Sequence, residues 1–547
     1  MKKILIYGLS ALGLMFAASC SDLLEEESYV EVGKNNYVNN AEEAETVLMG
    51  IYKDLANEYM YSYHLSLLFT ISSDIAQCEG SATTSFREIP TNSHNPSTSQ
   101  IMQTWQKLYS SIYEANDFIE TVSARMGSWS SSNRELATIY LGEAHALRAL
   151  FYFELVRWYG NIVLITSTEQ SSLPATEYVQ ADPKDVYAFI ESDLKYAAEV
   201  LPWAVDDTKR SSNAYRMSKG AALGLLAKVY CTWAGYPVRD ESKWAEAAKV
   251  ARQVIESGKH RLIPDYKTVW SNTCNGIWDA GESLIEVSFY SPTSLDSDQT
   301  AGRIGKWNGV MADAVEGQRG RNAANWKVVY TFTREWETHN DPRMALSIAD
   351  YKYDSSKGDG PVTYISTVTN PTEDNLNKQR QLYTPAKWDT EKYVNSANYM
   401  VNNDKSCINW YILRYSDVLL LFAEALNESG GSIVDAVDAV NAVRRRGFGD
   451  SDHDLSYGLS REALREAIRK ERAYELCFEG HRKQDLIRWG IYYQTIRNTA
   501  QELVNWFSNA NYTVGRFTIE GRHELLPIPQ RELDLMTQCK QNPGWGE

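Results

Sequence analysis

The sequence has few features of a metal-binding, catalytic or nucleic-acid-binding protein. Its seven cysteines, spread over 547 residues, form no CxxC pair and no metal-like spacing, so no structural zinc and no essential disulfide are expected. HExxH, GxSxG, Walker A and GxGxxG motifs are absent, and nothing singles out a glycosidase pair among the 71 acidic residues. The chain has only 55 basic residues, so its net charge is negative. A nucleic-acid partner is not expected, because recognition of its phosphates needs a concentrated basic face. We predict no catalytic residue, no metal ligand and no nucleic-acid partner.

Long apolar runs are also missing, except at the N-terminus. Two lysines precede the apolar segment Ile4–Ala18, which is too short to span a bilayer and typical of a signal-peptide core. Small residues then lead into Cys20, as in a bacterial lipobox. We predict a lipoprotein signal peptide over residues 1–19 and an acidic tether, lipidated at Cys20, over residues 20–39. Ordinary cleavage beside an incidental cysteine is the alternative.

Aromatic residues are abundant, with 16 Trp and 34 Tyr. Some of these rings must fill the core. Flat amphipathic rings also suit a surface that stacks on the C–H faces of sugars. Composition therefore favours a globular protein in which a carbohydrate-binding surface is plausible on chemical grounds.

Helical periodicity dominates both ends of the chain. It predicts single helices around residues 40–55, 105–119, 136–158 and 182–197, with Asn40 and Asp182 as N-caps. Two helix pairs, near residues 226–258 and 422–446, have the large–small–large spacing of tetratricopeptide-like units. The predicted fold class is therefore mostly α, with little β-structure.

Residues 259–405 differ from this pattern. One short strand is predicted over residues 283–289, between long Gly- and Ser-containing loops. Loops of this length inside a domain are usually functional or disordered. We therefore predict one domain over residues 40–547, with a helical-repeat scaffold over about 40–258 and 406–547 and a loop-rich insertion over about 259–405.

A charge-dense segment near the C-terminus could be mistaken for an active site. Its acidic and basic residues alternate at steps of three and four, which allows pairing on one helical face. The interpretation favoured here is a structural ion-pair network that locks helices together. The predicted pairs are Arg472–Glu475, Glu479–Arg482 and Asp485–Arg488.

Four segments resemble the SusD/RagB family of outer-membrane nutrient-binding lipoproteins. They are Ala149 to Gly160 (ALFYFELVRWYG), the helix pair Tyr415 to Arg446, the charged Glu471 to Gly490 (ERAYELCFEGHRKQDLIRWG), and the closing LPIP and QNPG motifs at 526–529 and 541–544. These segments occur in order from residue 149 to residue 544. Together with the lipobox they extend the resemblance over essentially the whole chain.

The resemblance implies a SusD-like α-helical fold and a binding protein without catalysis. Such a lipoprotein lies on the cell surface, anchored to the outer membrane, and delivers a glycan or oligosaccharide to a SusC-like TonB-dependent transporter. It implies no cofactor, and a structural calcium ion is left open. The alternatives are a RagB-like peptide-nutrient binder, a surface glycoside hydrolase and a purely structural lid.

A glycan site needs an exposed aromatic platform flanked by groups that reach ring hydroxyls. Two loop stretches have this chemistry. The first, residues 73–94, contains Asp74, Arg87 and Asn92, and the family's ligand residues include groups from this part of the chain. The second, residues 301–307, ends in Trp307 beside Gly305 and Lys306. We predict Asp74, Arg87, Asn92 and Trp307 as ligand-binding residues.

Overall fold

The computed structural model describes residues 37–211, 215–289, 301–316, 318–358, 360–369, 371–394, 404–507 and 510–546. The predicted signal peptide, Cys20 and most of the predicted tether lie outside these ranges. Within them, no helix is both long enough and apolar enough to cross a membrane.

The four helices predicted in this half are present, with the predicted N-caps, but α3 extends about six residues further at each end and α4 begins five residues earlier than predicted. Asn40 caps α2, its side-chain oxygen accepting a hydrogen bond from the Glu43 N–H at 3.0 Å. Asp182 caps α5 in the same way, with Pro183 in the first turn. Helix α4 ends at Gly160, whose φ of 67° is readily adopted only without a Cβ atom. The helices of this half are α2 (Ala41–Leu55), α3 (Ser99–Arg125), α4 (Ser131–Tyr159), α5 (Pro183–Val200), α6 (Thr208–Ser211), α7 (Lys219–Ala234), α8 (Lys243–Glu256) and α9 (Tyr266–Cys274).

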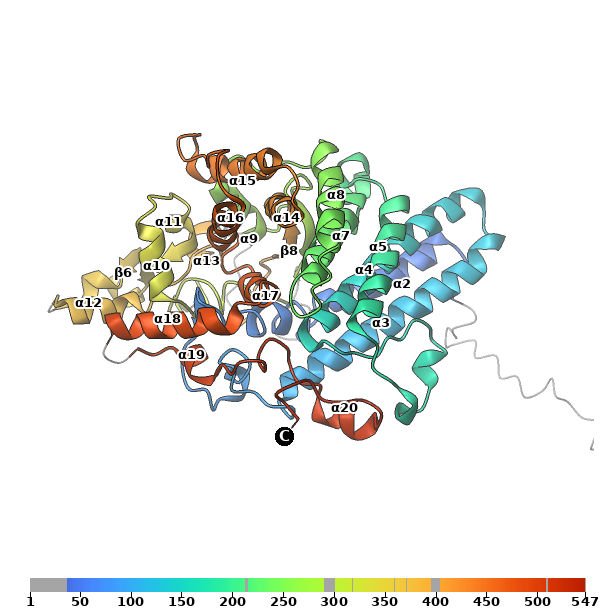
Figure 1. Cartoon of the computed structure of the whole chain (residues 1–547), viewed down its shortest axis with the longest axis horizontal. Helices are drawn as coiled ribbons and strands as arrows, with labels where there is room; N and C mark the ends of the chain where they lie inside the picture. Colours follow the sequence, from blue (N-terminus) through green and yellow to red (C-terminus); the bar gives the residue numbers. More distant parts are fainter. Residues whose placement is uncertain are drawn as a thin grey trace, which may run out of the picture.

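Both predicted helix pairs are present and form part of one continuous stack. Helix α7 packs on α8, α14 packs on α15, and α8 and α14 join the two pairs. The stack runs from α2–α5 at one end of the molecule through α7 and α8 to α14–α16 (Figure 1). The remaining helices are α10 (Tyr330–Glu337), α11 (Met344–Ser347), α12 (Glu373–Arg380), α13 (Thr390–Tyr393), α14 (Tyr415–Glu428), α15 (Ile433–Phe448), α16 (Arg461–Glu475), α17 (Arg482–Arg488), α18 (Tyr492–Trp506), α19 (Thr513–Phe517) and α20 (Gln530–Leu535).

The described β-structure consists of short antiparallel pairs, which confirms a mostly α fold. The pairs are β1 (Ala76–Cys78) with β3 (Trp326–Val328), β2 (Ser283–Val287) with β8 (Trp410–Arg414), β4 (Ile348–Ala349) with β7 (Thr384–Pro385), and β5 (Tyr351–Tyr353) with β6 (Pro361–Thr363). Strand β2 matches the strand predicted at 283–289.

The predicted insertion contains more ordered structure than its composition suggests. Short helices and strands fill much of it, and Trp270, Trp336 and Trp388 are fully buried there. Trp326 lies in β3 rather than in the helix that its spacing with Tyr330 and Trp336 indicates. Many of these tryptophans are therefore core residues, because short elements still need large side chains to exclude water between them.

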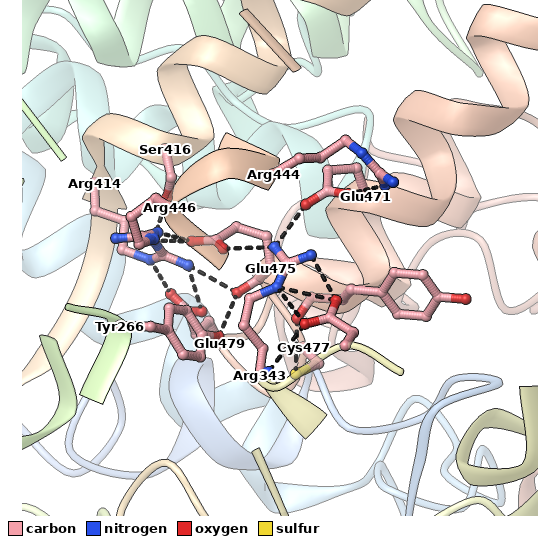
Figure 2. A network of polar contacts seen from close by, with 12 residues as sticks. Tyr266, Arg343, Arg414, Ser416, Arg444, Arg446, Glu471, Glu475, Cys477 and Glu479 are labelled. Atoms are coloured by element: carbon pink, nitrogen blue, oxygen red, sulfur yellow. Dashed lines mark hydrogen bonds and ion pairs between the residues drawn. The ribbon is translucent and has the colours of Figure 1, made fainter. Parts of the chain in front are cut away.

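A buried ion-pair network joins α14–α16 to the insertion. Glu475, at the end of α16, contacts three guanidinium groups, those of Arg343, Arg414 and Arg446 (Figure 2). Burial by itself would raise the pKa of Glu475, but these three cations hold it well below its usual value. The structure therefore confirms a structural ion-pair network in this segment.

Two of the three predicted pairings inside this network are wrong. Arg472 pairs with Asp485 and Asp417. Glu479 pairs with Arg414 and Lys387, and Arg482 pairs with Asp74. The chain leaves the helix after Glu475 and Phe478 adopts a φ of 67°, so helical spacing does not hold between α16 and α17. Only Asp485–Arg488, which lies within α17, pairs as predicted.

Strand β2 carries a buried carboxyl group with an incomplete set of partners. Glu286 Oε1 accepts a hydrogen bond from Asn409 Nδ2 at 2.9 Å. Glu286 Oε2 and Asn409 Oδ1 are both buried without a partner. A buried carboxyl group with so few partners favours its protonated, uncharged form. Burial accordingly raises the pKa of Glu286 to about 7.

We expect Glu286 to make the protein less stable as the pH rises from 4.5 to 7. In the unfolded state the pKa of Glu286 has its ordinary value of 4.5. Between pH 4.5 and 7 the unfolded state has therefore released a proton that the folded state still holds. The free energy of unfolding should fall by up to about 3 kcal/mol. Glu286→Gln keeps an oxygen to accept from Asn409 Nδ2 but cannot titrate, so it should remove this slope. Urea unfolding at pH 5 and pH 7.5 measures it, and equal slopes in the two proteins would contradict the assignment.

Candidate functional site

The segment that presents Trp307 is held firmly against the chain that leads into β8. Gly302 and Ser406 exchange two backbone hydrogen bonds, at 3.1 and 2.7 Å. Ser406 Oγ also donates to the carbonyl of Ile304 at 2.6 Å. Gly305 has a φ of 80°, and a Cβ atom there would lie 2.7 Å from Ile408. The Trp307 backbone is therefore positioned by the frame of the protein.

Trp307 lies at the centre of a cluster of aromatic rings. Its half-buried ring makes edge contacts with Tyr63 at a centroid distance of 4.8 Å and with Phe86 at 5.1 Å. Its indole Nε1 donates a hydrogen bond to Asp404 Oδ1 at 2.8 Å. Tyr63 immediately precedes the π-helical turn His64–Leu68. Three segments that are far apart in the sequence thus meet at one aromatic surface.

Charged groups surround this cluster. The Arg303 guanidinium lies 4.3 Å from the centre of the Tyr63 ring and pairs with Glu58 at 2.8 Å and Asp404 at 3.3 Å. The two carboxylates are 45% and 44% exposed. They can therefore accept hydrogen bonds from a bound molecule while the arginine fixes their positions.

Arg87 reaches the same cluster through its neighbour Phe86. Its guanidinium carbon lies 4.3 Å from the centre of the Phe86 ring. Its Nε donates to the Glu79 carbonyl at 2.6 Å, which holds the guanidinium beside that ring. The structure thus brings Arg87 and Trp307, both predicted from sequence, into contact with the same phenylalanine.

Asp74 and Asn92 lie elsewhere. Asn92 is 2% exposed, and its amide donates to Tyr492 and Thr518 at 2.8 Å each. Its φ of 60° and these bonds hold it in the interior, so it contributes no group to the Trp307 cluster. Asp74 forms a two-bond ion pair with Arg482 at 2.7 and 2.9 Å, on a separate surface.

Several members of the cluster carry no sequence signal for ligand binding. Phe86 and Arg303 lie inside the two predicted stretches, and their neighbours Arg87 and Trp307 point to them. Three others reach the cluster only through contacts with residues more than 90 positions away in the sequence: Tyr63, Glu58 and Asp404. Long-range contacts of this kind leave no local pattern to detect.

The side chains of this surface suit the binding of a sugar. In the described ranges, no three His, Cys, Asp or Glu side chains form a group that could hold a metal ion. Half-buried rings beside exposed carboxylates and guanidinium groups match the apolar faces and hydroxyls of a sugar. The lysine within the Trp307 segment, Lys306, is buried, which lowers its pKa to about 8.

Comparisons with known proteins agree on one family. The SusD family matches residues 288–545, and a family described as starch-binding and associating with the outer membrane matches residues 22–231. A SusD homologue of known structure from Bacteroides thetaiotaomicron is 53% identical, covering 95% of this chain and all of the other, with a TM-score of 0.90.

More distant relatives extend over nearly the same length. A laminarin-binding SusD-like protein of known structure is 25% identical over 93% of this chain and all of the other, with a TM-score of 0.69. SusD-like protein P25 from Formosa agariphila is 24% identical, and the match covers 94% of each chain.

Proposed function

The chain belongs to the SusD family, and from this premise we propose that it is a non-catalytic glycan-binding protein. The observation that carries the proposal is the cluster of Trp307, Tyr63 and Phe86, flanked by Arg303 and two exposed carboxylates. This cluster offers ring faces and hydrogen-bonding groups in one place. Because its backbone is already bonded to the frame, binding requires little ordering of the chain, which favours affinity.

The ligand class rests on chemistry and on relatives together. One relative binds laminarin, and one matching family is described as starch-binding. Both ligands are neutral glucans, and we propose a glycan or oligosaccharide as the ligand here. Asp404, Glu58 and Arg87 are the groups proposed to reach its hydroxyls.

The proposal extends to cellular location and partner. We propose that Cys20 carries the lipid anchor and that the protein lies on the outer surface of the outer membrane. From there it would deliver its ligand to a SusC-like TonB-dependent transporter. The lipobox-like N-terminus and the outer-membrane association named for one matching family support this arrangement. A tether would raise the effective concentration of the protein at its transporter.

Affinity electrophoresis of the chain from Ser21 against a panel of polysaccharides tests the glycan-binding function. We expect at least one neutral polysaccharide to retard the protein and Trp307→Ala to weaken that binding tenfold or more, or about 1.4 kcal/mol. Trp278→Ala is the matched control, because Trp278 is also half-buried but contacts Tyr215 on another surface.

Each alternative has a distinct result. Shortening of the polysaccharide would indicate a glycoside hydrolase. Binding of peptides alone would indicate a RagB-like function. A protein that binds neither, yet forms a complex with its transporter, would be a structural lid. Equal binding by the wild type and Trp307→Ala would remove Trp307 from the site.

A further inference from the structure

A second surface of the protein, formed by α10, α16 and α18, is hollowed into a groove. Its cavity has a volume of about 690 Å³, within the range of about 300–1,000 Å³ usual for small-molecule sites. Trp307, Tyr63 and Phe86 do not line it. Asp74, which the sequence analysis singled out, does line it, together with its partner Arg482.

The groove contains the most exposed tryptophan of the protein. All sixteen tryptophans lie in the described ranges, and Trp506 alone is classed as exposed, at 39%. Tyr330 contacts its edge at a centroid distance of 5.9 Å, and Arg334 lies 4.8 Å from the ring centre. An indole placed in a groove and still accessible to solvent is a platform for a flat apolar face.

A carboxylate without a partner lies one helical turn before this platform. Glu502 and Trp506 are four residues apart on α18, so they share a helical face. Both line the groove. The Glu502 side chain is exposed, and its carboxylate has no hydrogen bond or ion pair with another residue in the described ranges. It is therefore available to accept hydrogen bonds from hydroxyls beside the ring.

The charges of the groove, Glu502 included, balance, and most of the others are paired. Four acidic residues (Asp74, Glu335, Glu466 and Glu502) and four basic residues (Arg334, Arg469, Lys470 and Arg482) line it. Lys470 pairs with Glu335 at 2.9 Å, and Arg469 pairs with Glu466 at 2.8 Å. A lining with no net charge favours a neutral ligand over a polyanion, which would need a surplus of cations.

We propose that this groove is a second carbohydrate site, which binds a neutral oligosaccharide on Trp506 and Glu502. A peptide fits less well, because the groove is walled mainly by helices whose backbone groups bond internally and provide no strand edge. The threonine hydroxyls at 331, 338, 495 and 499 add neutral donors and acceptors to the lining. The site is separate from the Trp307 surface and does not require that surface to bind.

The test introduces Trp506→Ala into two proteins, the wild type and the Trp307→Ala variant. Both are produced as the chain that starts at Ser21. The neutral probes are laminarin, starch, galactomannan, xyloglucan and arabinoxylan; polygalacturonate, chondroitin sulfate and a casein peptide digest are the comparison probes. Dissociation constants come from affinity electrophoresis for the polysaccharides and from titration calorimetry for the peptides. We expect Trp506→Ala to weaken binding of a neutral polysaccharide fivefold or more in the Trp307→Ala background.

Two further variants separate binding from folding. Glu502→Gln keeps the shape of an exposed side chain and should weaken the same binding about threefold. Val504→Ala is the control, because Val504 is 60% exposed on the same helix but does not line the groove. It should leave binding unchanged, and melting temperatures should agree among the three α18 variants.

The outcomes also distinguish this proposal from the function proposed above. Loss of binding in Trp506→Ala but not in Trp307→Ala would uphold the groove and remove the Trp307 surface. Three results would contradict a carbohydrate site in the groove. The Trp307→Ala variant could bind no neutral probe, or Trp506→Ala could leave the binding of neutral probes unchanged. The third is an effect of Trp506→Ala that is confined to the anionic polysaccharides or the peptides.

Discussion

Arg414→Ala should destabilise the protein by about 3–5 kcal/mol, a large share of the 5–15 kcal/mol that typically holds a domain together. Arg414 is fully buried and pairs with Glu479 at 2.7 Å, Glu475 at 2.5 Å and Glu282 at 3.1 Å. Removing its guanidinium leaves these three carboxylates short of a counter-charge in the interior. Burial of an uncompensated charge costs far more than the loss of a surface ion pair.

Arg445→Ala is the matched control for this prediction. Arg445 pairs with Asp454, but its side chain is 46% exposed. An exposed pair contributes about 0–1 kcal/mol, because water already solvates both ions. Urea unfolding of the two variants measures the difference. Equal midpoints would show that the buried network does not stabilise the fold.

Acid should unfold the protein steeply below pH 4.5. The pKa values of Asp193, Asp417, Glu475, Glu479 and Asp485 are all lowered in the folded state. Burial alone would raise each of them, but neighbouring cations outweigh burial. Below their ordinary values of 3.8 and 4.5, the unfolded chain therefore takes up protons that the folded chain does not, and stability falls with pH.

The acid effect should exceed about 5 kcal/mol by pH 2, since each unit of pKa displacement is worth about 1.4 kcal/mol and five groups contribute. Urea midpoints between pH 6 and pH 2.5 measure it. Repeating the series in 0.5 M NaCl is the control, because salt screens exposed charges much more than buried pairs. A midpoint that stays constant down to pH 2.5 would contradict the prediction. The slope from Glu286 has the opposite sign and lies at higher pH, so the two effects can be separated.

The ion-pair network and the Trp307 surface are linked through β8. Arg414, at the end of β8, belongs to the network, and Ser406 and Asp404, a few residues earlier, hold and contact the Trp307 segment. The stability of the buried network therefore supports the position of the aromatic surface.

Sequence patterns predict two residues of the proposed site. Trp307 is predicted because a tryptophan beside glycine in a polar loop is a poor candidate for the core, and Arg87 because its stretch resembles the family's ligand region. Asn92 has the same resemblance, yet its amide is buried against Tyr492 and Thr518. Whether an amide faces solvent or another helix depends on residues 400 positions away, and no local pattern contains that information.

The sequence alone determined local features: the helix caps at Asn40 and Asp182, the helix pairs and the strand β2. Short motifs in it also indicated the family to which the chain belongs. These features depend on neighbouring residues and on the 3.6-residue period of the helix. Tertiary structure alone decided which charges of different segments form ion pairs and which aromatic rings are in contact. Glu475 finds Arg343 and Trp307 finds Tyr63 because packing brings distant segments together. Electrostatic and aromatic contacts depend on the distance between two groups in space. Spacing along the chain specifies that distance within a helix but not beyond the end of the helix.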